Sequence, residues 1–205
     1  MKAKTLTMSL LLFFVIFLEQ SSSFSIDWLC IPGERVGPIT AETSISTLKE
    51  IFGEKNIRTL DVSSEELDTG PKILTYIFPD DKNELRIQWK DETFKNPWVV
   101  AFNNKGTQWK TPEGITIGSS LEEVMRINKK DFILTGFGWE YGGWVKSWND
   151  GELGKKYKNK LSVFFDEGNG TIKGVEYIGD KRNLKSSDEN LIKAELKVNS
   201  VQCVF

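Results

Sequence analysis

The chain has 205 residues, of which 27 are basic and 29 acidic, so its formal net charge is −2 at pH 7. This near balance gives no strong attraction to nucleic acid or to an anionic membrane, and we expect neither as a partner. Histidine is absent, which excludes Ser-His-Asp and Cys-His nucleophiles and nearly every catalytic zinc site, and we predict no cofactor or metal.

Residues 1–23 have the three parts of a secretory signal peptide. Lys2 and Lys4 precede the apolar run 10–18, and a polar segment rich in serine follows. The apolar run is about half as long as a membrane-spanning helix. We therefore predict a leader that is cleaved rather than a membrane anchor.

Cleavage after Ser23 or Ser25 places small residues at the −3 and −1 positions. Cleavage after Ser23 leaves residues 24–205, and the loss of two lysines and one glutamate changes the formal charge from −2 to −3. This length suffices for one well-buried domain. We predict an exported protein, secreted or periplasmic, whose mature form does not span a membrane.

Cys30 and Cys203 lie near opposite ends of the mature chain. In an exported protein such a pair is expected to form a disulfide. Two free thiols are the first alternative. Lipidation of Cys30 is the second, although the preceding residues 27–29 are not small and lie well past the apolar run.

Alternating apolar and polar residues predict an antiparallel sheet. Segments 72–78 and 84–90, joined by a turn at 79–83, are typical of a hairpin. Loops rich in Gly and Asn separate the other expected strands. These strands are 98–103, 106–110, 132–137, 143–148, 160–166, 174–178 and 195–205.

Two segments have helical spacing of apolar residues. The segment 44–53 begins at Ser44 and ends at a glycine, and the segment 119–128 contains capping-box pairs such as Ser120 with Glu123. A third, short helix near 187–193 is left open. The predicted fold class is α+β: a twisted antiparallel sheet with two short packed helices.

The two predicted helices follow similar segments. Gly37-Pro38-Ile39-Thr40 precedes the first and Gly114-Ile115-Thr116-Ile117-Gly118 the second, with starts 77 residues apart. The pattern predicts a duplicated helix-plus-strands unit. The single domain would then contain two tandem subdomains, about 24–110 and 111–205.

Segment 114–124 resembles the strand-turn-helix entry of the β-lactamase-inhibitor-protein-like superfold. Segments 32–40 and 136–143 are similar to a set of uncharacterised exported bacterial proteins. The resemblance implies a bacterial origin and a compact α+β domain, and the family has no established activity. No functional residue transfers from the inhibitor-like resemblance, so β-lactamase inhibition is not inferred.

Segment 136–144 combines four glycines with the large rings of Trp139, Tyr141 and Trp144. One interpretation is a recognition loop, because Trp and Tyr offer large contact areas at small entropic cost. The other is a bulged hairpin whose glycines admit the rings into the core.

The next residues extend this candidate site. In a strand, Trp144, Lys146 and Trp148 share one face, opposite Val145 and Ser147. That face would present two rings and a cation to a partner, unless neighbouring segments cover it. The candidate binding residues are Trp139, Tyr141, Trp144, Lys146 and Trp148.

Two other features are weaker candidates. Glu140 with Asp166 or Glu167 has the composition of a glycosidase pair, although nothing in the sequence brings these carboxylates together. The basic run 155–160 has two interpretations, a contact for an acidic partner or lipid headgroups and a hydrated loop, of which the loop is the plainer.

The leading hypothesis is an exported, non-enzymatic protein that binds another envelope protein or a polymer. The alternatives are a structural or stress-related envelope protein and, behind it, a carboxylate-based glycoside hydrolase. Binding predicts exposed rings in the candidate site, whereas a structural role predicts buried ones. The sequence does not define the oligomeric state.

Overall fold

The computed structural model describes residues 26–61, 73–166, 172 and 174–205. The predicted leader at 1–23 lies outside the described residues. Within them, helices and three antiparallel sheets form an α+β fold, which confirms the predicted class.

The largest sheet has six strands in the spatial order β3-β4-β5-β6-β11-β9. Every neighbouring pair is antiparallel. Four strands come from the N-terminal half of the chain and two from the C-terminal half, so the predicted subdomains share one sheet. The strands are β3 (Ile57–Asp61), β4 (Ile73–Ile77), β5 (Leu85–Trp89), β6 (Pro97–Phe102), β11 (Lys197–Val204) and β9 (Leu161–Asp166).

Two smaller sheets flank it. One pairs β1 (Cys30–Ile31) with β2 (Arg35–Val36). The other has β7 (Ile133–Leu134) between β10 (Leu184–Lys185) and β8 (Val145–Ser147).

Four α-helices lie within the described residues, rather than the two that were predicted. Ser44 caps the first, with its Oγ accepting from the Thr47 N–H at 3.2 Å, and Ser120 caps the second, accepting from the Glu123 N–H at 3.1 Å. The helices are α1 (Ile45–Phe52), α2 (Leu121–Asn128), α3 (Glu152–Tyr157) and α4 (Glu189–Lys193), with 3₁₀ turns η1 (Glu54–Asn56), η2 (Lys158–Lys160) and η3 (Val175–Tyr177).

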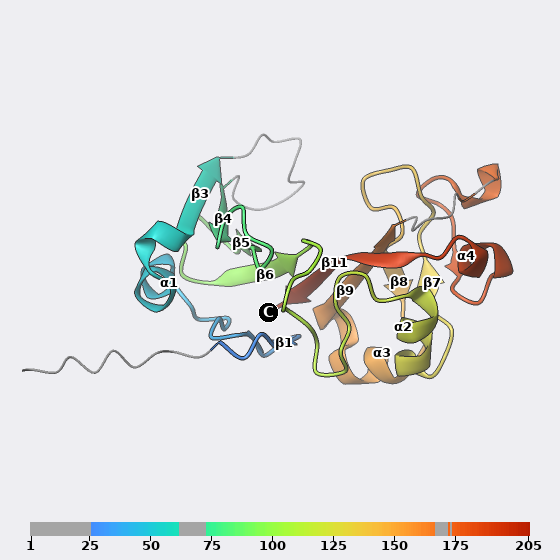
Figure 1. Cartoon of the computed structure of the whole chain (residues 1–205), viewed down its shortest axis with the longest axis horizontal. Coiled ribbons are helices and arrows are strands. Elements are labelled where there is room, and N and C mark those ends of the chain that lie inside the picture. Colours follow the sequence, from blue (N-terminus) through green and yellow to red (C-terminus); the bar gives the residue numbers. More distant parts are fainter. Residues whose placement is uncertain (1–25, 62–72, 167–171, 173) are drawn as a thin grey trace, which may run out of the picture.

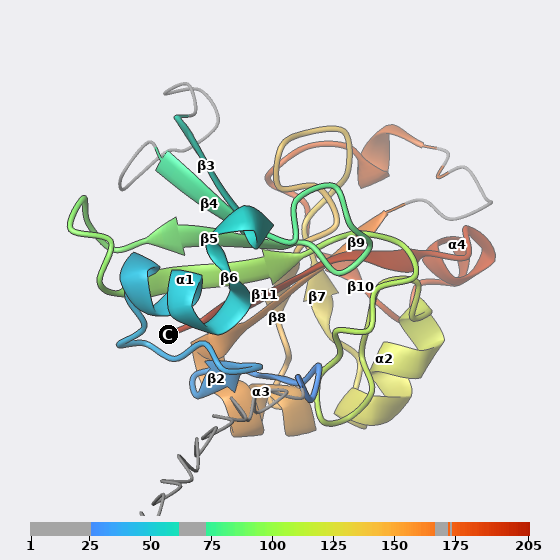
Figure 2. The same ribbon diagram turned by 60° about the vertical axis from the view of Figure 1, so that its left-hand side comes forward.

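The core lies on one face of the six-stranded sheet. Figures 1 and 2 show α1, α2, α3 and the β1–β2 pair on this side. Strand alternation directs a row of buried side chains toward them, among them Ile87, Val100 and Cys203 on three adjacent strands. Trp89 and Trp109 are also fully buried, and their burial anchors the sheet to the layer beneath it.

The predicted disulfide joins Cys30 in β1 to Cys203 in β11, with 6.8 Å between their Cα atoms. Both cysteines are fully buried. Because disulfides persist in oxidising compartments, this bond indicates a location outside the reducing cytoplasm. Among the described helices, none combines the length and apolar character that crossing a membrane requires.

Two strand predictions are wrong. Residues 106–110 form a turn and an extended segment, in which Lys110 makes one isolated bridge to Leu29. Segment 174–178 contains the 3₁₀ turn η3, because Gly174, at φ 124°, turns the chain away from extended geometry.

The interpretation of 155–160 as a hydrated loop is also wrong, because these residues complete α3 and form η2. Leu153 and Tyr157, four positions apart, bury one side of α3. The N-terminus of α3 is capped from another helix: the Oδ1 of buried Asn128 in α2 accepts from the Leu153 N–H at 3.1 Å.

Candidate functional site

The glycine-rich segment 136–144 lies across the sheet from α1, α2 and α3, as the yellow-orange loop above the sheet in Figures 1 and 2. It is attached to β9: the Phe165 N–H donates to the Gly143 carbonyl at 2.9 Å, and Trp144 bridges to Phe164. Gly143 has φ 71°, and a Cβ here would run into the Phe165 carbonyl oxygen. Glycine therefore permits this close approach of the loop to the strand.

Side chains also fix the loop internally. The hydroxyl of buried Thr135 donates to the Tyr141 carbonyl at 2.6 Å and accepts from the Trp144 N–H at 3.0 Å. The indole N–H of Trp139 donates to the Gly136 carbonyl at 2.8 Å, and its ring meets that of Tyr141 edge-on, with centroids 5.4 Å apart. These contacts hold the rings in place, which lowers the entropic cost of binding.

The three rings of this loop line a pocket of about 310 Å³, named here the aromatic pocket. Strand β9 provides the floor of this pocket through Ser162 and Phe164. These residues alternate with Leu161, Val163 and Phe165, which are buried in the core on the other face of the strand. The lining residues are Trp139, Tyr141, Trp144, Ser162, Phe164 and Gln202.

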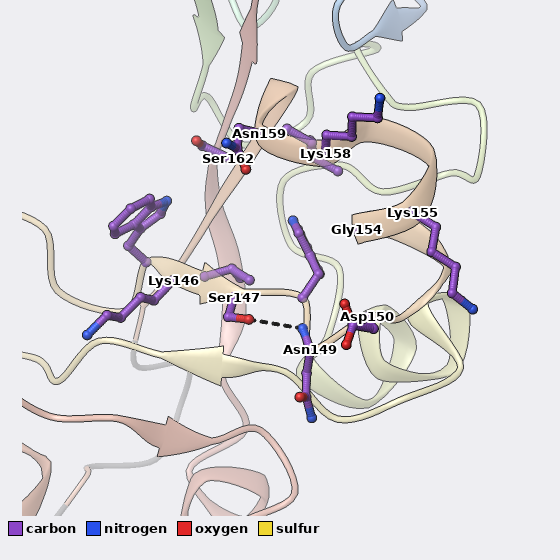
Figure 3. A pocket seen from close by; sticks show the side chains of 13 residues that line it. Lys146, Ser147, Asn149, Asp150, Gly154, Lys155, Lys158, Asn159 and Ser162 are labelled. Carbon is purple, nitrogen blue, oxygen red and sulfur yellow. Dashed lines mark hydrogen bonds between the residues drawn. The ribbon is translucent and has the colours of Figure 1, made fainter.

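A second pocket, of about 560 Å³, lies between β8 and α3 and is named here the polar pocket (Figure 3). It shares Trp144 and Ser162 with the aromatic pocket, so the two adjoin. Its lining residues are Trp144, Val145, Lys146, Ser147, Trp148, Asn149, Asp150, Gly154, Lys155, Lys158, Asn159, Leu161 and Ser162.

Lysines outnumber carboxylates in the lining of the polar pocket. The lining contains one carboxylate, Asp150, and three lysines, Lys146, Lys155 and Lys158. Figure 3 shows the three amines on different sides of the pocket, extending outward from its rim rather than converging. Lys155 also pairs with Glu152 at 3.4 Å. The rim thus carries separated positive charges.

An ionic cluster holds the helical wall of the polar pocket in place. The Tyr157 hydroxyl lies 2.8 Å from both carboxylate oxygens of Glu113, and the Lys156 amine lies 2.5 Å from one of them. Burial, together with the Glu113 carboxylate, raises the pKa of Tyr157 to about 12. Burial opposes ionisation of Glu113, but the hydrogen bonds from Lys156 and Tyr157 outweigh it and lower the pKa of Glu113. The charged cluster therefore ties α3 to the loop before α2.

All five predicted binding residues line one pocket or the other, but they do not share one face. Trp148 is only 7% exposed, and its ring packs against Phe132 with centroids 5.3 Å apart. The predicted common face of Trp144, Lys146 and Trp148 is therefore wrong for Trp148. Strand β8 ends at Ser147, and a turn follows in which Asn149 has φ 51°, so alternation does not continue to Trp148.

Sequence reasoning missed the residues that β9 and β11 contribute. Phe164 and Ser162 alternate with core residues, which was a usable signal for the outward face of β9. Gln202 lies opposite Ser162 on the neighbouring strand, a pairing that requires knowledge of the sheet order. These residues turn an aromatic loop into a pocket.

Of the carboxylates considered for hydrolysis, Glu140 and Asp166 line neither pocket. Glu140 is exposed and Glu167 lies outside the described residues. Asp150 is the single carboxylate among the described residues that line the two pockets. In the described ranges, His, Cys, Asp and Glu form no group of three suited to a metal ion.

Comparison of the chain with known protein families, curated proteins and solved structures finds no match. The chemistry of the site therefore rests on its own residues.

Proposed function

We propose that the protein is an exported, non-enzymatic binding protein that holds an envelope protein or polymer against Trp139, Tyr141 and Trp144. The carrying observation is that one hydrogen-bonded loop presents three aromatic rings around a pocket. Rigid aromatic anchors in a concave site are typical of binding hot spots. The predicted leader and the Cys30–Cys203 disulfide support a secreted or periplasmic location.

The composition of the two pockets favours binding over hydrolysis. A glycoside hydrolase of the usual kind needs two carboxylates flanking its substrate, and Asp150 is unaccompanied in the described lining. A structural role, the second candidate, is favoured for Trp148 by its burial against Phe132. It explains the rings of the aromatic pocket less well, since Trp139 is 36% exposed.

The test follows the indole N–H signals of the seven tryptophans by NMR in the oxidised mature protein. The probes are dextran, polygalacturonate, soluble peptidoglycan fragments and an envelope-protein fraction. We expect at least one probe to shift the Trp139 and Trp144 signals while those of the core residues Trp89 and Trp109 stay in place.

Trp144→Ala should weaken that binding at least tenfold, as loss of a central aromatic anchor does. Trp98→Ala is the control, because Trp98 is as exposed as Trp139, at 36%, but lies outside both pockets. The proposal fails if no probe shifts the Trp139 and Trp144 signals, or if Trp144→Ala binds as tightly as the wild type.

A further inference from the structure

We infer that the ligand is an acidic polysaccharide whose sugar rings stack on Trp144 and whose charged groups meet the lysines around the polar pocket. This inference rests on the proposed function and names the chemical class of its ligand. It draws on the adjoining pockets, their hydrogen-bonding groups and the placement of their charges.

The aromatic pocket has the two kinds of surface that a sugar ring needs. A pyranose ring has C–H groups on its faces and hydroxyls around its edge. Trp144 and Phe164 offer apolar surface, while Ser162 and Gln202 from the sheet offer a hydroxyl and an amide beside them. The aromatic rings can cover the face of the sugar while the polar groups bind its hydroxyls.

The two pockets together suit a chain rather than a single sugar. Their volumes, about 310 and 560 Å³, each fall within the ~300–1,000 Å³ range of small-molecule sites. Because Trp144 and Ser162 line both, a ligand that leaves the aromatic pocket past these residues enters the polar one. There it meets a further polar group, the side-chain amide of Asn159.

The charges favour an acidic chain. Lys146, Lys155 and Lys158 lie around the polar pocket, whose acidic lining residue is Asp150. Lys155 is paired with Glu152, so Lys146 and Lys158 are the lysines assigned to the ligand. Their amines spread around the rim instead of converging (Figure 3), which suits carboxylates repeated along a polymer better than one phosphate group.

The ligand test compares three polymers by isothermal titration calorimetry at low salt. Oligogalacturonate supplies sugar rings with carboxylates, its methyl ester supplies the same rings without charge, and poly-L-glutamate supplies carboxylates without sugar rings. We expect oligogalacturonate to bind at least threefold more tightly than either. Raising NaCl from about 0.05 M to 0.5 M should remove most of that advantage, because exposed charges are screened.

Paired variants locate the two contributions. Lys146→Gln with Lys158→Gln should weaken oligogalacturonate binding about three- to tenfold and leave the methyl ester unchanged. Lys55→Gln with Lys90→Gln removes the same charge from exposed positions outside both pockets and should have little effect. Trp144→Ala should weaken binding of both polymers.

The outcomes separate this inference from the proposed function. Equal binding of the acid and the ester, lost in Trp144→Ala, would overturn the acidic ligand but support a binding site. Tighter binding of poly-L-glutamate, or of a thymidine oligonucleotide titrated in the same way, would also overturn it. Failure of both galacturonate polymers to bind would do the same. Binding that is insensitive to Trp144→Ala would overturn inference and function together.

Discussion

The two faces of β9 (Leu161–Asp166) show how one strand serves both a core and a surface site. Leu161, Val163 and Phe165 are buried beneath the helices, and Leu161 also borders the polar pocket. Ser162 and Phe164 line the aromatic pocket on the other face. The core face is covered by packed apolar side chains and linked to β1 by the Cys30–Cys203 disulfide. On the opposite face, hydrogen bonds hold the loop 136–144 in a conformation that leaves the aromatic pocket open. Alternation in a strand thus separates residues that stabilise the fold from residues available to a ligand.

Removal of the disulfide should have the largest effect, and it acts on the core side. Cys30→Ala with Cys203→Ala opens a loop with a sequence separation of 173 residues, and the chain-entropy model gives a loss of roughly 5 kcal/mol as an upper figure. Urea unfolding of the oxidised wild type, the reduced wild type and the variant measures the loss. Equal midpoints for the oxidised wild type and the variant would contradict a stabilising role for the bond.

Trp144 and Trp148, four residues apart, allow a direct comparison between a pocket residue and a core residue. Trp148→Ala should cost about 3–5 kcal/mol of unfolding free energy because it empties a core position, whereas Trp144→Ala should cost about 1 kcal/mol or less. Acrylamide quenching with the two Trp→Phe variants provides an independent measure. Trp144→Phe should remove an accessible emission component and Trp148→Phe a shielded one. Similar accessibility of the two rings would contradict the assignment of opposite roles.

The attachment of the loop to β9 can be broken at Gly143. Alanine there combines a positive φ with a collision against the Phe165 carbonyl, so we expect a loss of about 2–4 kcal/mol and altered Trp144 fluorescence. Gly106 is the matched control, because it also has a positive φ, 77°, but open space around it. Gly106→Ala should cost about 1 kcal/mol. Equal losses in the two variants would argue against a close fit between loop and strand.

The smallest expected effect concerns the Glu113 cluster behind the polar pocket. Since folding lowers the pKa of Glu113 below its ordinary 4.5, the cluster stabilises the fold above about pH 4.5. That contribution is lost as the pH falls through the lowered folded-state pKa. Glu113→Gln should therefore reduce stability by less than about 1 kcal/mol at pH 7, and the deficit should shrink on acidification. Glu152→Gln, at an exposed pair with Lys155, is the control, and urea unfolding across pH 3–8 separates them.

Local patterns in the sequence predicted much of the fold. Strands such as β5, with one face buried, alternate visibly, and the serine caps of α1 and α2 lie next to the helices they start. Helix α3 was missed because its capping side chain, Asn128, comes from a different helix. Strand β3 was missed because it is largely exposed and has little alternation.

The candidate site was likewise predictable only where local sequence patterns define it. Its rings at 139, 141 and 144 were recognisable because they cluster with glycines in one short segment. Two features depended on tertiary structure: the turn that buries Trp148, and the pairing of β9 with β11 that places Gln202 beside Ser162. Short-range patterns identified the loop, but long-range pairing made it a pocket.

The bond between Cys30 and Cys203 also makes residues 30–203 a covalent ring. A single protease cut anywhere between these residues opens the ring without releasing a fragment. The cut protein is equivalent to a circular permutant whose original ends are joined through sulfur. It should migrate as one species on a non-reducing gel and as two after reduction, so the cut fragments stay tethered for as long as the disulfide remains oxidised.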